Sequence, residues 1–449
     1  MRTLLRAALK SSAGTLVALL SSVVAIKIIA TVAGPTGIGL FSILRQAQQT
    51  AAIAGSIGGQ AAIVQGLSNK TGDERDAHTA LILRAVLIST FLVSVAIILA
   101  APWVAPMILG AMPNSADVLR LIAVPTVLGA ALIFLSGIIT SHRRVGLLAI
   151  VQIASGLTLA TFAYFAASSP TGVSFIILLS ASGLAGLTVA AYFCVRNDWL
   201  KILRTTWWRR GDKLHATAFY RVGAATMIAG MMGAGAVLIV RTLVSMHHGL
   251  GGAGIFDAAW TISMTYVTLI LTSLSAYYLP TLTTLQGKAE ERNQLIQQYF
   301  RFATFASIPL IGSVVVLKPW AIHFLYSEEF FQAIYTMRWM LLGDFFKISS
   351  WVFAMPMLAY ADMRPYLIGE FFWNAAFVSI TAIVLSSGQG IESIGIVFLI
   401  LYVLYFLYTY FYCVRKYRFR LTNAVAISWI LGLIFLLLLS FVISKFQVF

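Results

Sequence analysis

Several basic side chains fall inside long apolar stretches of the sequence. Lys27 and Arg45 lie on either side of the segment Gly34–Gly37, and Arg241 and Arg338 lie in later apolar stretches. A charge at membrane depth is costly and almost always faces a partner or a water-filled cavity. Few acidic residues are expected at matching depth, so an anion would offset the cost of burying these cations. The pattern therefore favours a substrate site for phosphate or pyrophosphate at these four residues.

A second group of charged residues occurs in the later half of the chain, at Asp257, Asp344, Lys347 and Glu370. Asp344 and Lys347 are three residues apart, so on a helix they share one face and can pair. Glu370 is expected at a depth close to that of Lys347, which also allows a contact between those two. Carboxylates at membrane depth can titrate, so this group is a candidate for ion coupling or gating.

Composition indicates the elements that must position these residues. The chain has 449 residues, of which 60% are hydrophobic and only 10% are charged, and its mean hydropathy is +0.90. Soluble domains are close to half apolar and a quarter charged, so we expect a multispanning membrane protein. Thirteen apolar runs are long enough for a helix to span a membrane. These predicted spans are 8–33, 38–67, 80–101, 117–140, 147–167, 172–195, 217–246, 254–285, 295–317, 332–360, 366–385, 392–414 and 422–444.

The net charge of +16 would also suit a protein that binds nucleic acid, but its distribution argues against such a partner. With the N-terminus in the cytoplasm, most Lys and Arg fall in inside segments, including the basic run from Arg415 to Arg420. The outside segments carry Lys318 and Lys445. This asymmetry follows the positive-inside rule and predicts a multi-pass membrane protein with a cytoplasmic N-terminus, in contact with membrane lipids.

The sequence contains an internal repeat. A glycine-rich motif that begins at Gly37 recurs at Gly252, displaced by 215 residues (252 − 37 = 215). Arg84 followed by Pro102-Trp103 recurs as Arg301 followed by Pro319-Trp320, and each Pro-Trp pair is expected to end a span. The matching residues of the motif are Gly37, Gly39 and Phe41 in the first copy and Gly252, Gly254 and Phe256 in the second.

The repeat predicts an all-α polytopic membrane protein with two six-helix lobes in parallel orientation around a central cavity. The expected lobes are residues 1–196 and 217–415. Residues 197–216 alternate Trp and Leu with Lys and Arg, which is typical of a short interfacial helix on the cytoplasmic face. Residues 422–444 are apolar, and we expect them to form a thirteenth membrane helix outside the repeat.

Motifs for catalysis and cofactor binding are absent from the sequence. It contains no GxxxxGK[ST] phosphate loop, no HExxH motif and no cluster of Cys and His with metal-ligand spacing. We therefore expect no catalytic residues, no metal, no cofactor and no ATP hydrolysis by this chain. A membrane-embedded glycosyltransferase or polymerase stays an alternative, although such enzymes usually carry their charged residues in larger extramembrane loops.

Four short segments combine glycine, proline and charged residues: Gly34–Leu40 with Arg45, Tyr278–Leu282, Leu342–Asp344 followed by Lys347, and Arg364–Tyr366 followed by Glu370. Together they resemble the bacterial polysaccharide flippases of the multidrug/oligosaccharidyl-lipid/polysaccharide exporter superfamily, and most closely the translocases of O-antigen and enterobacterial common antigen type.

This resemblance implies a twelve-helix, two-lobed fold that moves an undecaprenyl-pyrophosphate-linked oligosaccharide, as in lipopolysaccharide and related polysaccharide biosynthesis, from the cytoplasmic to the outer leaflet. It implies that Lys27, Arg45 and Arg241 engage the pyrophosphate or acidic sugars. A polysaccharide polymerase and a chain-length regulator are the protein partners expected of such a flippase. The thirteenth span departs from the twelve of the family. A cation-coupled multidrug exporter of the same fold is the alternative, although its cavity would be acidic rather than basic.

Overall fold

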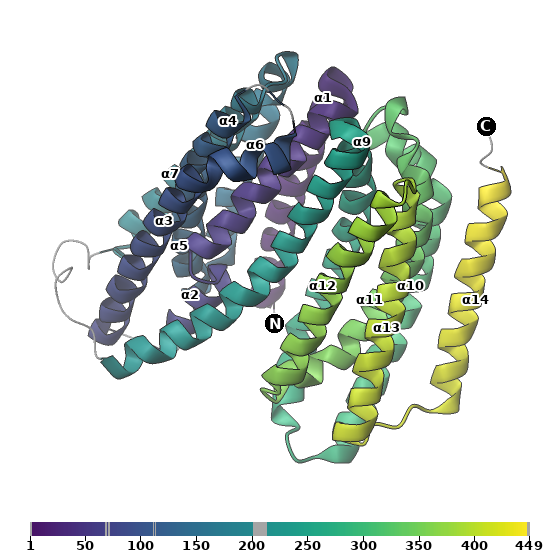
Figure 1. The fold of residues 1–449 in the computed structure, drawn as a ribbon. Helices are drawn as coiled ribbons and strands as arrows, with labels where there is room; N and C mark the ends of the chain where they lie inside the picture. The colour runs from purple at the N-terminus through teal and green to yellow at the C-terminus, as the bar shows by residue number, and fades with distance from the viewer. Residues whose placement is uncertain are drawn as a thin grey trace. The chain divides into compact units, whose positions relative to one another are not determined.

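The computed structural model describes residues 2–67, 70, 72–110, 112, 114–200 and 213–446. Across these residues the chain is helical and contains no strand (Figure 1). A helix pairs its backbone donors and acceptors internally, which a segment surrounded by lipid requires. The predicted all-α class is confirmed.

The chain divides into two units, Met1–Gly254 and Ile255–Phe449, each with its own internal contacts. In unit 1, α1 packs most extensively against α6, and α5 packs against α2 and α7. The elements of unit 1 are α1 (Arg2–Gly55), α2 (Gly59–Leu67), α3 (Gly72–Leu109), α4 (Ser115–Leu121), α5 (Ala123–Ser141), α6 (Val145–Ser168), α7 (Gly172–Arg196) and the first part of α9 (Lys213–Thr284).

Unit 2 contains the rest of α9 and the later helices. Its closest packing is between α11 and α13, and α14 packs against α10 and α11. The thirteenth predicted span is thus a helix, α14. The elements of unit 2 after α9 are α10 (Ala289–Leu325), the 3-10 helix η1 (Glu328–Phe330), α11 (Ala333–Ala359), α12 (Met363–Ser386), α13 (Glu392–Tyr417) and α14 (Asn423–Phe446).

The predicted break between the first two spans is a single residue. Gly34 has φ 62° and ψ −164° inside α1, and Gly249 has φ 71° and ψ 175° inside α9. Glycine adopts a positive φ without the steric cost that a side chain would add. Pro35 follows at the first position of the resumed helix, where its missing N–H costs nothing. The two breaks are 215 residues apart (249 − 34 = 215), the displacement predicted for the repeat.

The two copies of the glycine motif contact each other backbone to backbone. A β-carbon on Gly39 would overlap the carbonyl oxygen of Leu250, and one on Gly254 would overlap the carbonyl oxygen of Pro35. Leu250 and Pro35 are themselves one repeat apart (250 − 35 = 215), so the two contacts are equivalent. Glycine permits this approach of two helices because it has no side chain.

The eleven long apolar helices of the described chain account for all thirteen predicted spans. Two of them, Leu20–Leu67 and Gly223–Thr272, contain the breaks at Gly34 and Gly249 and therefore cover two spans each. The other nine cover one span each.

Both Pro-Trp pairs, at which spans are expected to end, lie inside helices, and the positions at which these helices leave the membrane stay a prediction. The helix α3 continues past Pro102 to Leu109, and α10 continues past Pro319 to Leu325. A proline removes only its own hydrogen bond, and ending the helix in lipid would leave more backbone groups unpaired.

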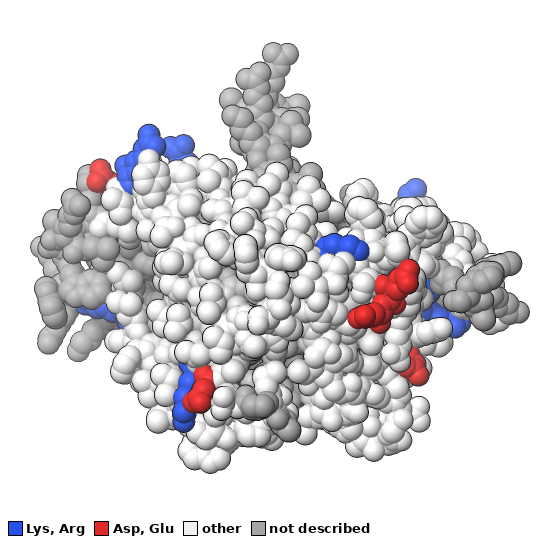
Figure 2. Space-filling view, turned by 90° about the horizontal axis from the view of Figure 1, so that it is seen from above, with Lys and Arg blue, Asp and Glu red and all other residues white. Residues whose placement is uncertain are grey.

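The predicted interfacial helix falls mostly outside the described residues, since residues 201–212 are not described. Of its described part, Asn197–Leu200 form a turn, in which the Trp199 ring stacks on His142 at 4.1 Å between centroids. The lobe bounds at 196 and 217 stay a prediction. Figure 2 shows that charged atoms are sparse on one face of the molecule, in keeping with the low charged content of the chain.

Candidate functional site

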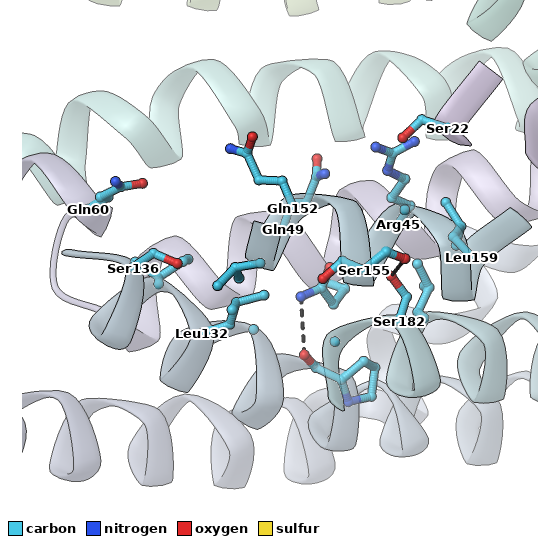
Figure 3. A pocket seen from close by; sticks show the side chains of 18 of the residues that line it. Ser22, Arg45, Gln49, Gln60, Leu132, Ser136, Gln152, Ser155, Leu159 and Ser182 are labelled. Atoms are coloured by element: carbon cyan, nitrogen blue, oxygen red, sulfur yellow. Dashed lines mark hydrogen bonds between the residues drawn. The ribbon is translucent and has the colours of Figure 1, made fainter. Parts of the chain in front are cut away.

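A polar cavity of about 530 Å³ lies within unit 1 (Figure 3). Five helices contribute to its lining: α1, α2, α5, α6 and α7. Among the described residues that line it, one is basic and none is acidic. The polar side chains of the lining are Arg45, Gln48, Gln49, Gln60, Gln152, Ser22, Ser136, Ser155 and Ser182.

The kinked helix α1 supplies much of this lining. Arg45, Gln48 and Gln49 are spaced i, i+3, i+4, so they lie on one helix face. Ser22 precedes the break at Gly34 and still lines the same cavity. The single-residue break therefore allows both segments of α1 to contribute to one site.

Two glutamines of the cavity are held by hydrogen bonds to neighbouring helices. Gln48 donates from Nε2 to the carbonyl oxygen of Pro125 at 3.1 Å, and Gln60 donates from Nε2 to Thr140 Oγ1 at 2.6 Å. A β-carbon on Gly129 would overlap the Gln48 amide, so this glycine makes room for it. The two amides are fixed before any ligand enters.

Three other polar groups have no hydrogen-bond partner within the described chain. Gln49 and Gln152 are exposed, and neither side chain makes a hydrogen bond there. The Ser155 hydroxyl is buried and also lacks a partner. In Figure 3, Gln49, Gln152 and Arg45 point to the same side of the cavity. The amides of Gln49 and Gln152 and the Ser155 hydroxyl are available to bind a polar ligand.

Arg45 is half-buried and its guanidinium carbon lies 6.0 Å from the centre of the Phe41 ring. The ring lies one helical turn away on α1, where its π-face can attract the guanidinium. A guanidinium surrounded by neutral amides and hydroxyls is suited to bind a carboxylate or phosphate in a fixed orientation.

The other predicted cations of unit 1 have different environments. Arg241 is 6% exposed and donates from Nη1 to Gln46 Oε1 at 2.6 Å. Lys27 is half-buried. Neither lines the cavity that contains Arg45. The predicted aqueous cavity shared by Lys27, Arg45 and Arg241 stays a prediction.

In unit 2, Asp344 lies in the protein interior with no exposed surface. Its Oδ2 accepts hydrogen bonds from Ser263 Oγ at 2.7 Å and from the Tyr266 hydroxyl. Its Oδ1 is buried without a hydrogen-bond partner in the described chain. Because both donors come from α9, the carboxyl joins α9 to α11.

The expected ion pairs of Lys347 are not formed. Within the described residues, no ion pair joins Lys347 to Asp344 or to Glu370. Its ammonium donates to Met264 Sδ at 2.9 Å and lies 5.2 Å from the centre of the Tyr402 ring. Aromatic rings attract a desolvated cation through their quadrupole, which explains this alternative to pairing.

The remaining predicted site residues of unit 2 are Glu370, Arg338 and Asp257. Glu370 accepts a hydrogen bond at Oε1 from the Tyr405 hydroxyl at 2.8 Å. Arg338 lies with its guanidinium carbon 5.2 Å from the centre of the adjacent Trp339 ring. Asp257 is buried on α9. Their roles in ion coupling, gating or substrate binding stay predictions.

Comparison with known proteins places this chain in a family. Residues 28–335 match the family described as "Polysaccharide biosynthesis protein", which is more than two thirds of the 449-residue sequence. The chain belongs to this family. The predicted relationship to polysaccharide flippases is thereby confirmed at the level of the family.

Among curated proteins, the chain is 29% identical over 135 residues to the Lipid III flippases of Escherichia coli K12 and Shigella flexneri. The match covers 30% of this chain and 32% of each relative. It therefore spans about a third of the length of these curated relatives.

The fold is similar to that of several solved membrane transporters. An inward-facing multidrug resistance MATE family transporter has a TM-score of 0.72 at 15% identity, covering 87% of this chain and 94% of the other. The Lipid II flippase MurJ has a TM-score of 0.70 at 11% identity, covering 99% and 100%. At such identities the likeness concerns the fold alone.

For this polysaccharide biosynthesis protein, sequence reasoning found Arg45 but missed the glutamines and serines around it. A signal was present, since Gln46, Gln48 and Gln49 interrupt an apolar helix directly after Arg45. Amides at membrane depth are also costly and tend to be functional. Gln60, Gln152 and the serines join them only through tertiary packing.

Proposed function

We propose that this protein is a flippase for an undecaprenyl-pyrophosphate-linked oligosaccharide, of the type used for O-antigen or enterobacterial common antigen. It moves this lipid from the cytoplasmic to the periplasmic leaflet of a bacterial inner membrane by alternating access, without ATP hydrolysis. One observation carries the proposal: the cavity of unit 1 combines Arg45 with amides and hydroxyls within a membrane-embedded helical unit. The family match and the Lipid III flippase relatives support it.

The cavity fits the head group of such a lipid. A pyrophosphate or an acidic sugar needs a cation, and neutral sugars need groups that both donate and accept hydrogen bonds. Asp344 is the buried carboxyl best suited to couple the cycle to protons or sodium, with Asp257 and Glu370 as the other candidates. A polysaccharide polymerase and a chain-length regulator would act on the product.

The test is a translocation assay in proteoliposomes that contain the lipid-linked oligosaccharide. Membrane-impermeant periodate oxidises only outward-facing glycan, so its consumption over time reports the rate. We expect Arg45→Gln to slow translocation about tenfold or more, because it removes a charge-assisted contact of about 1.5–3 kcal/mol. Arg45→Lys keeps the charge but loses the paired donors, so an intermediate rate is expected.

Arg301→Gln is the matched control. Arg301 is an exposed arginine in the membrane helix α10, and the Phe305 ring lies 5.7 Å from its guanidinium carbon. Its replacement should leave the rate at the wild-type value. Wild-type translocation by a folded Arg45→Gln protein would refute the role of Arg45, and no translocation by the wild-type protein would refute the flippase itself.

A cation-coupled multidrug exporter is the second candidate. Its support is the similarity of the fold to that of a multidrug resistance MATE family transporter, and Asp344 beside Tyr266 is the buried acidic residue through which we test it. Susceptibility to cationic drugs, compared in cells with the wild-type chain and with Asp344→Asn, separates the two. Drug resistance conferred by the wild type and lost in the variant would favour the exporter.

A further inference from the structure

The cavity of unit 1 has two chemically different ends. In Figure 3, Arg45 and Ser22 lie together at one end, Gln60 and Ser136 lie toward the other, and Gln49 lies between them. A single guanidinium neutralises at most one anionic group closely, whereas most of the polar lining is neutral. The cavity is therefore larger than a phosphate site requires.

The neutral part of the lining matches the chemistry of sugar hydroxyls. Each carboxamide offers two N–H donors and a carbonyl acceptor, and each serine hydroxyl both donates and accepts. Sugar hydroxyls also do both, so adjacent amides can bind neighbouring hydroxyls of one ring. A site lined by carboxylates or by apolar groups alone would not offer this pairing.

The hydrogen bonding of these polar side chains also supports a sugar ligand. Gln48 and Gln60 are fixed by hydrogen bonds to α5, so they shape the wall of the cavity. Gln49 and Gln152 make no hydrogen bond within the described chain, and the buried Ser155 hydroxyl lacks a partner there. A buried polar group without a partner costs free energy, which a ligand hydroxyl would recover.

We propose that this cavity is a glycan subsite in which Gln49 and Gln152 bind sugar hydroxyls and set which oligosaccharide is accepted. The sugars extend from an anionic group at Arg45 toward Gln60. This inference rests on the proposed flippase function and deepens it. It assigns substrate selection to two uncharged residues, because an oligosaccharide lacking the matching hydroxyl would leave an amide desolvated and unpaired.

The first test measures binding to the purified full chain in nanodiscs by titration calorimetry. The probes are the glycan released by mild acid from the host's lipid-linked oligosaccharides, and inorganic pyrophosphate. We expect Gln49→Leu and Gln152→Leu to weaken glycan binding at least about fivefold each and to leave pyrophosphate binding unchanged. Arg45→Gln should abolish pyrophosphate binding.

Gln65→Leu is the matched control, since Gln65 is an exposed glutamine of α2 that does not line the cavity. It should bind the glycan like the wild type, which separates lost contacts from a general effect of leucine. Wild-type glycan affinity in both cavity variants would overturn the proposal. So would an absence of glycan binding by the wild-type chain.

The second test uses proteoliposomes that contain two lipid-linked oligosaccharides of different sugar composition. Gln49→Leu and Gln152→Leu should change the ratio of the two translocation rates, whereas Gln65→Leu should not. If the wild type translocates both and the cavity variants keep its ratio, the glycan subsite is wrong and the flippase stands. If the wild type translocates neither, the flippase function itself is wrong.

Discussion

In unit 1, Gln49 and Gln152 line a cavity, and their amides make no hydrogen bond within the described chain. In unit 2, by contrast, Asp344 accepts hydrogen bonds from Ser263 and Tyr266. Both regions place polar groups in helices long and apolar enough to cross a membrane. They differ in how far the protein itself satisfies those groups, since Asp344 Oδ2 accepts from two donors, although its Oδ1 has no partner in the described chain, and the two amides have none there.

This difference separates two roles for polar residues at membrane depth. A group satisfied by neighbouring helices contributes to stability, and its removal leaves those neighbours unpaired. A group that faces a cavity without a partner contributes little to stability and is free to bind a ligand. Variants of unit 2 should therefore change stability most, and variants of the unit 1 cavity should change binding most.

Replacement of Asp344 should give the largest change in stability. In Asp344→Ala, the hydroxyls of Ser263 and Tyr266 lose their acceptor in the protein interior. Asp344→Asn keeps an acceptor oxygen in place. We expect the alanine variant to be about 2 kcal/mol less stable than the asparagine variant. Thermal unfolding in detergent measures the difference, and equal melting temperatures would show that unit 2 does not depend on this acceptor.

A smaller change is expected from Gly129→Ala in the cavity wall. The added methyl group would overlap the Gln48 amide and break its bond to Pro125, at a cost of about 1 kcal/mol. Gly183→Ala is the control, since Gly183 also lines the cavity but its added methyl would meet only Leu128, at 3.4 Å. Both variants gain helix propensity equally.

We therefore expect Gly129→Ala to be the less stable of the pair and to bind the released glycan more weakly. Unfolding temperatures and glycan titrations of the two variants provide the measurement. If the two variants were indistinguishable in both, Gln48 would not be a fixed part of the cavity wall.

The smallest effect concerns pH and the end of α5. Burial, with the positive charges of Arg75 and Arg144, lowers the pKa of His142 from 6.5 to about 4. Between these values the unfolded chain binds a proton that the folded chain does not, so stability falls as pH falls from about 6.5 to about 4.

His142→Phe keeps a ring to stack on Trp199 but does not titrate. Between pH 7 and pH 4.5, the melting temperature of the variant should fall less than that of the wild type. Glycan binding by both should be insensitive over this range, because amides and hydroxyls do not titrate. An identical pH response in the two proteins would show that His142 does not contribute.

The elements set by local chemistry could be predicted from the sequence. The apolar runs predicted the spans, and the Gly-Pro segment predicted the break that the structure places at Gly34. The displacement of 215 predicted an equivalent break, which occurs at Gly249. These features depend on hydropathy and on backbone preferences of glycine and proline, which are properties of neighbouring residues.

The partners of individual side chains could not be predicted in the same way. The spacing of Asp344 and Lys347 allowed a pair, but Asp344 instead binds residues of α9 that are 78 and 81 positions away. The cavity likewise gathers glutamines from three helices. Both outcomes depend on which helix faces meet, and helical periodicity alone does not determine that.

The reciprocal contacts of Gly39 and Gly254 also bear on how the chain can evolve. Each glycine lies against a carbonyl oxygen of the other repeat copy. A larger residue in one copy would therefore clash with the other copy, and a rearrangement within its own copy would not remove the clash. The two copies of an internal repeat are usually free to diverge in sequence. At this crossing the atom that each added β-carbon would meet belongs to the main chain, which no side-chain replacement in the other copy removes. Both positions should therefore stay glycine in related sequences.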